Sequence, residues 1–146
     1  MQRLTAVEEA KTLMNEAKDW SVWHWLLEKR RVRSTADKAT DALGALEKKV
    51  KAAWSEDLKK AYRDLSGNGK AGKIQSDLKL ALERIRQADD AAYDARMDAE
   101  ATFDEAERRL SADMARAGAE KAIEAWELRE KAIRRAEAVG RNHARG

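Results

Sequence analysis

Apolar residues recur every three to four positions along most of the chain, which is the spacing of amphipathic helices. The two clearest stripes cover residues 36–65 and 74–114. Much of the second stripe is alanine, and small side chains let helix axes approach closely. Small side chains also bury little area, so we expect Trp54 and Tyr62 on the facing segment to fill the remaining space.

Residues 66–73 interrupt this pattern with Gly67, Gly69 and Gly72, in a chain that has no proline. Glycine and asparagine are typical of turns that need positive φ angles. The segment also has the G-x-x-x-x-G-K spacing of a phosphate-binding loop. However, Ile74 stands where a Ser or Thr would hold magnesium, and a helix precedes the segment instead of a strand. The pattern therefore predicts the turn of a helical hairpin.

The first segment is apolar on more than one side around residues 20–27. A helix of this kind is buried against more than one neighbour, so we expect a contact surface beyond the hairpin partner. The candidate interface residues are Trp20, Val22, Trp23, Trp25 and Leu26. Two alternatives stay open, which are packing of these tryptophans in the core and attachment of the segment to a membrane surface.

Two interruptions of the apolar stripe predict helix ends. The stripe loses phase before Ser34 and Thr35, which resemble a helix start. A second break is expected near Gly118, although the stripe can also continue through it. The predicted fold is all-α, a single domain (1–146) forming an elongated antiparallel bundle or coiled-coil hairpin of three or four helices. Its main turn is at 66–73, and its helices cover about 3–31, 35–65, 74–115 and 119–139, the last two separate or continuous.

Charge is distributed unevenly along the chain. Charged residues make up 39% of the sequence and the net charge is +3, with 16 cations and 11 anions in residues 1–73 but 14 cations and 16 anions in residues 74–146. The densest basic run contains Lys29, Arg30, Arg31 and Arg33, which could contact phosphates. No aromatic residue interrupts the run, so base stacking on it is not expected. The simpler interpretation is a solvated helix end.

The sequence gives little support for catalysis. It has no cysteine, and neither of its two histidines has a second histidine at helical spacing. Asp90, Asp94 and Asp98 form an acidic row, but nothing around them predicts the six or more oxygens of a calcium site. We therefore expect no catalytic residues, no cofactor, no metal and no small-molecule substrate.

The pattern favours a structural or protein-interaction role through helix packing and self-association. The general form resembles the coiled-coil hairpins of many structural and scaffolding proteins. We expect a homo-oligomer or a complex with another helical protein, while nucleic-acid binding and attachment to a membrane surface are the alternatives. No apolar run approaches the roughly 20 residues that cross a bilayer, and no signal peptide is visible at the start. The expected location is the cytoplasm.

Overall fold

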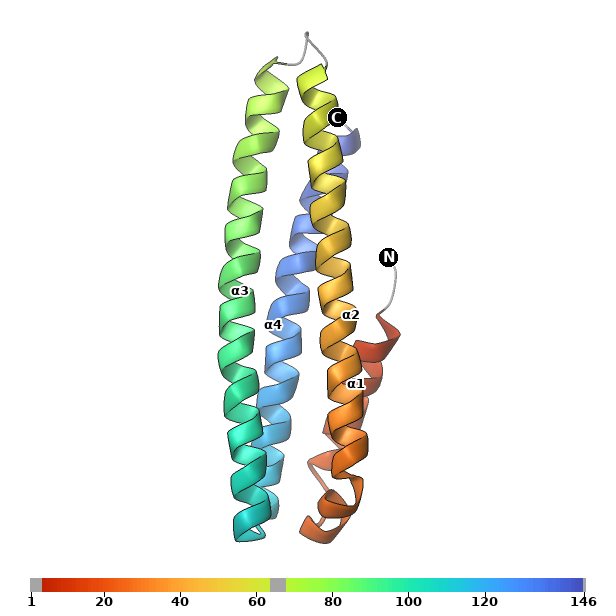
Figure 1. Ribbon diagram of the computed structural model, residues 1–146, viewed down its shortest axis with the longest axis vertical. Helices are drawn as coiled ribbons and strands as arrows, with labels where there is room; N and C mark the ends of the chain where they lie inside the picture. The colour runs from red at the N-terminus through yellow and green to blue at the C-terminus, as the bar shows by residue number, and fades with distance from the viewer. Residues whose placement is uncertain (1–3, 64–67, 146) are drawn as a thin grey trace.

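Four helices make up the described part of the chain, residues 4–63 and 68–145 of the computed structural model. They are α1 (Thr5–Ala17), α2 (Val22–Arg63), α3 (Asn68–Arg109) and α4 (Ala112–Arg145). The three long helices run up, down and up beside one another, and short α1 lies along the lower half of the bundle (Figure 1). The predicted all-α elongated antiparallel bundle is confirmed.

The predicted break near residues 31–35 is wrong, because α2 continues without interruption from Val22 to Arg63. The chain breaks earlier, at residues 18–21, between α1 and α2. Ser21 caps α2, since its Oγ accepts a hydrogen bond from the backbone N–H of His24 at 3.2 Å. Leu27 is 85% exposed and does not belong to the core, so counting it as a core position made the apolar stripe seem to break after it.

The break predicted near Gly118 is also wrong. The turn between α3 and α4 is at Leu110 and Ser111, inside the predicted helix 74–115, and α4 passes through Gly118. Leu110 has a φ of 52°, and the Ser111 N–H donates to the carbonyl of Ala106 at 2.9 Å, which ends α3. Ser111 Oγ then accepts the N–H of Met114 at 3.2 Å and caps α4.

The main turn is shorter than predicted. Helix α3 begins at Asn68, so residues 68–73 are helical, while the rest of the predicted turn falls among residues 64–67, outside the described part of the chain. A helical backbone from Asn68 onward is not the extended loop that a phosphate-binding motif needs. Gly72 is exposed within α3.

Helix α3, which carries the alanine stripe, packs much more extensively on α4 than on α2. Buried alanines from both helices form this seam, namely Ala92, Ala99 and Ala106 of α3 with Ala115, Ala119 and Ala125 of α4. Gly118 sits so close to α3 that an added Cβ would be 2.6 Å from the Phe103 ring. The prediction of close packing by small residues therefore holds for a different helix pair.

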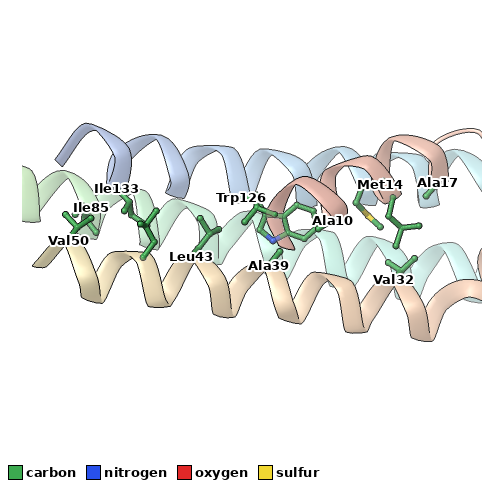
Figure 2. Packing of buried hydrophobic residues seen from close by; sticks show 14 of the residues in the cluster. Ala10, Met14, Ala17, Val32, Ala39, Leu43, Val50, Ile85, Trp126 and Ile133 are labelled. Atoms are coloured by element: carbon green, nitrogen blue, oxygen red, sulfur yellow. The ribbon is translucent and has the colours of Figure 1, made fainter. Parts of the chain in front are cut away.

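Trp54 and helix α1 complete the core on the α4 side of α2. Trp54 is buried, and its Nε1 donates to the carbonyl of Ala136 on α4 at 3.0 Å. Helix α1 lies against α2 and α4 and buries Val7, Ala10, Met14 and Ala17. Figure 2 shows Ala10, Met14 and Ala17 in the same row of buried side chains as Val32 and Trp126. The side chain of Tyr62 lies outside the described residues.

Candidate functional site

The opposite side of α2, toward α3, is less completely filled. Of the three pairs of long helices, α2 and α3 make the fewest contacts. A groove of about 510 Å³ lies between them, and α4 forms part of its floor with Ala122, Ala125 and Trp126. In Figure 1 α2 and α3 face the viewer with α4 behind them. We call this feature the α2/α3 groove.

An aromatic cluster closes the lower end of the groove. Trp25 is only 4% exposed, and its ring centroid is 4.5 Å from that of Phe103 on α3. Trp20 stacks on His24 at 4.3 Å and tilts against Trp25 at 6.2 Å. These contacts hold the start of α2 against α3 through stacked rings.

The predicted interface residues separate into three groups. Trp25 belongs to the core of its own chain, whereas Trp20, Val22 and Leu26 are half-buried. Trp23 is 69% exposed and is the member that could contact a partner with most of its surface. The simple alternative of core packing therefore describes Trp25, and the interface hypothesis now depends on Trp23.

Charged side chains form the rims of the groove. The α2 rim carries Lys29, Arg30, Arg33 and Asp37, and the α3 rim carries Arg96, Glu100, Asp104 and Glu107. Lys29 bridges the rims, because its Nζ is 3.0 Å from Glu107 Oε1. All four cations of the predicted polyanion site are exposed, and Arg31 pairs with Glu28 at 3.6 Å. A polyanion in the groove would meet the carboxylates of α3 directly.

A polar cluster joins the three long helices farther up the groove. The guanidinium of Arg129 on α4 lies between two carboxylates, with its Nε 3.0 Å from Asp89 Oδ1 of α3 and its Nη2 4.0 Å from Glu47 Oε1 of α2. Its Nη1 also donates a hydrogen bond to the backbone carbonyl of Thr40 at 3.4 Å. A single guanidinium thus contacts α2 and α3 together.

The two carboxyl groups of this cluster titrate differently. Burial, followed by the hydrogen bond and charge of Glu47, raises the pKa of Asp89 to about 6 against the attraction of Arg129. Burial also acts to raise the pKa of Glu47, but hydrogen bonds from Asp89 and Lys51 outweigh it and leave that pKa below its usual value. Asp89 is therefore the member of the pair that takes up a proton first.

The sequence contained a signal for this cluster that our sequence reasoning missed. Arg129 is three residues after Trp126 and four before Ile133, so it lies on the buried face of α4. A cation at such a position needs an anionic partner from a neighbouring helix. The identity of the partners, Glu47 and Asp89, depends on how the helices are placed.

Two pairs of exposed apolar side chains lie on α2 and α3 outside the core. Trp23 and Leu27 form one on α2, with exposed fractions of 69% and 85%. Tyr93 and Met97 form the other on α3, with exposed fractions of 60% and 38%. Of these four residues Tyr93 lines the groove, whereas Trp23 and Leu27 lie on the side of α2 opposite the groove-lining Trp25. The sequence analysis did not single out the α3 pair, because its two members are separated by charged residues.

The other sequence candidates lie apart from the groove or outside the described chain. Asp90, Asp94 and Asp98 are exposed, and Asp98 pairs with Lys121 of α4 at 3.6 Å. Among residues 4–63 and 68–145, no three His, Cys, Asp or Glu side chains gather as metal ligands would. Within the same described ranges, no helix has the length and apolarity needed to cross a membrane.

Comparison with known proteins adds no relative to this picture. No protein-family model, curated protein or solved structure matches the chain.

Proposed function

We propose that this protein is a non-catalytic structural and interaction protein that assembles by packing helices against helices, first of all with copies of itself. A cytoplasmic location is part of the proposal. The chemistry it needs is apolar burial with charged side chains at the rim, as in other protein–protein interfaces.

The α2/α3 groove is the observation that supports this proposal. Its floor is built from apolar side chains such as Trp25, Phe103 and Trp126, and its rims are charged. Helix α1 shows how this bundle accepts another helix, because α1 fills the comparable space between α2 and α4 with five buried apolar side chains. A groove flanked by exposed apolar residues is a common binding site for an amphipathic helix.

The two alternative functions have weaker support. For nucleic-acid binding, Arg30 and Arg33 are exposed on the α2 rim, but Glu100 and Asp104 face them across the groove and would repel phosphates. For a membrane surface, Trp23 and Leu27 are exposed, but acidic side chains are mixed with the nearby cations.

The mass of the chain in solution tests the proposal. Light scattering coupled to size exclusion should give a mass above 16.5 kDa that rises with concentration. Trp23→Ser should lower the mass toward the monomer, whereas Leu128→Ser, an exposed apolar position on α4, should leave it unchanged. A monomer at every concentration would reject self-association. Salt-sensitive retention of a labelled DNA duplex, or a blue shift of tryptophan emission with anionic vesicles, would then favour one of the alternatives.

A further inference from the structure

The link between α1 and α2, residues 18–21, is short and almost helical. It has neither glycine nor proline. Lys18 has the helical angles φ −59° and ψ −28°. The N–H groups of Lys18, Asp19 and Trp20 donate to carbonyls three or four residues earlier at 3.1–3.2 Å. Helix α1 therefore continues as a turn into the link, and the chain changes direction only around Trp20 and Ser21.

Straightening this link would satisfy more backbone groups than it frees. In the bent chain the first N–H groups of α2 have no acceptor within their helix, as at every helix start, and Ser21 Oγ supplies one for His24. In one continuous helix, the N–H groups of residues 21–24 would each meet the carbonyl four residues earlier. Straightening thus replaces one side-chain cap by four backbone hydrogen bonds.

The apolar residues of α1 and α2 keep one phase across the link. At about 100° per residue on a straight helix, all buried side chains from Val7 to Trp54 fall within an arc of about 140°, with Leu13 at one edge and Trp54 at the other. A bent chain does not require this agreement, because two separate helices can be rotated independently. The sequence therefore has the pattern of one amphipathic helix that runs from α1 into α2.

Contacts with α4 show how far straightening would carry α1. Lys11 of α1 lies 3.7 Å from Glu130, and the carbonyl of Thr40 on α2 accepts a hydrogen bond from Arg129 at 3.4 Å. Residues 11 and 40 are therefore level in the bent chain. On one straight helix they would be 29 residues, or about 44 Å, apart. Straightening thus removes α1 from its own bundle and leaves its place between α2 and α4 unfilled.

Two straightened copies can fill each other's places. If α1 of each copy takes the position of α1 in the other, residue 11 of one is level with residue 40 of the other, and a two-fold axis passes between residues 25 and 26. The link and the α3–α4 turn lie at the same end of the bundle (Figure 1). Lys29 contacts Glu107, so Leu110 is level with residue 26. The two bundles therefore meet end to end without overlap.

Exposed apolar side chains are concentrated at this junction. Trp23 and Leu27 lie within three residues of the axis and are 69% and 85% exposed. Leu110, on the turn at the end of the bundle, is 54% exposed. An end-to-end contact between two copies would shield part of this apolar surface from water.

We infer that two copies of this chain exchange α1, so that the link straightens, α1 and α2 become one helix, and α1 of each copy packs between α2 and α4 of the other. The inference rests on the proposed self-association and specifies its surface, which α1 already occupies in the single chain. The five buried side chains of α1 keep the same contacts in both forms, so the link and the junction decide the balance. The α2/α3 groove is not used and stays open to a further helix.

A proline at position 22 distinguishes the two forms. Val22 is the first residue of α2 in the bent chain, where proline is tolerated because the first helical N–H has no partner. In the straight helix the same position is interior, and proline would interrupt both long helices of the dimer. Val22→Pro should therefore weaken dimerisation by more than about a hundredfold in concentration-dependent light scattering. Val22→Ala, the matched control, should change it by less than about threefold.

Removal of the cap has the opposite expectation. Ser21→Ala deletes a hydrogen bond that only the bent form makes, so dimerisation should strengthen by about tenfold. Ser34→Ala, at an exposed position inside α2 in both forms, should leave it unchanged. A dimer that responds to neither Val22→Pro nor Ser21→Ala does not contain the straightened link.

A distance within one chain separates exchange from every other kind of self-association. Since the chain has no cysteine, Thr12→Cys and Leu128→Cys, both at exposed positions, can carry two spin labels. The labelled chain is refolded together with a large excess of unlabelled chain, so that distances are read within single chains. Exchange should move label 12 by about 40 Å along the bundle axis in the dimer fraction.

The monomer fraction is the internal control and should keep the short distance. A dimer that keeps it too would overturn the exchange of α1 and leave self-association standing. A chain that is monomeric at all concentrations would overturn both.

Discussion

Replacing Gly118 by alanine tests the closest approach between α3 and α4. A Cβ at this position would be 2.6 Å from two atoms of the Phe103 ring and 3.2 Å from a third, so the ring must move. Movement is restricted, because Trp25 stacks on the same ring at 4.5 Å. Forcing an extra carbon into such a contact typically costs about 1–3 kcal/mol.

Helix propensity acts in the opposite direction at this site. Alanine is favoured over glycine within a helix by about 0.5–1 kcal/mol. Gly72 provides the control, since it is exposed in α3 and an added Cβ there would meet nothing within 4 Å. Gly72→Ala should therefore gain about 0.5–1 kcal/mol, and Gly118→Ala should be less stable than Gly72→Ala by about 1–3 kcal/mol.

Urea denaturation of the two variants, followed by circular dichroism, measures this difference. Phe103→Leu provides a second test, because a smaller side chain should relieve the contact and allow Gly118→Ala to stabilise the protein in that background. If Gly118→Ala stabilises the unaltered protein as much as Gly72→Ala does, the close α3–α4 approach at Phe103 is refuted.

Three further substitutions probe other parts of the fold. The pKa of Asp89 is about 6 in the folded protein and near 4 in the unfolded chain, so the native state binds a proton more tightly. This proton binding contributes to the free energy of unfolding below pH 4, and the contribution is lost as the pH rises from 4 to 6. The melting temperature should thus fall between pH 4 and pH 6 and level off above pH 6. Asp89→Asn should remove this fall while Asp94→Asn keeps it; an unchanged slope in Asp89→Asn would contradict the assignment. Leu110→Gly should stabilise the protein by about 1 kcal/mol in chemical denaturation, since a left-handed φ disfavours leucine, whereas Leu80→Gly within α3 should destabilise it by a similar amount. Trp54→Phe should lower the free energy of unfolding by about 1–2 kcal/mol, because the indole loses a buried hydrogen bond to a backbone carbonyl of α4; no loss would show that this bond contributes nothing net.

The sequence predicted the kind of fold well because helical periodicity is a local property. The stripes at 36–65 and 74–114 are visible in any window of ten or more residues, and they define the long helices and the close packing of alanines. The pairing of helices is not a local property. The alanines of α3 were therefore expected to face α2, whereas α3 packs mainly on α4.

Helix ends were harder to predict, because several serine positions resemble caps. Ser34 and Ser111 both have side chains that can cap a helix, but of these two only Ser111 does so. It follows Leu110, whose left-handed backbone conformation could not be predicted because leucine does not favour it. Gly118 looked like a helix end, yet its small size serves a helix contact. Glycine marks either a turn or a close approach, and the sequence alone does not distinguish them.

The candidate site was only partly predictable for the same reason. Trp25 and the basic run both line the groove, but the groove also needs the α3 wall, which begins at Asp89, 56 residues after Arg33 in the sequence. Exposure of Trp23 beside burial of Trp25 depends on how α2 is rotated about its axis. Rotation is decided by neighbours on three sides, including α1 and the Phe103 ring.

The contact of Arg129 with both α2 and α3 has a consequence for how the long helices are aligned. Alanine-rich faces have little relief, so sliding one helix along another by a single turn would change their fit only slightly. Such a slide would carry the guanidinium about 5 Å away from Asp89 and Glu47 and separate three partly buried charges from one another. The contacts of Arg129 therefore select one axial register of the three long helices from several that the small residues alone would tolerate.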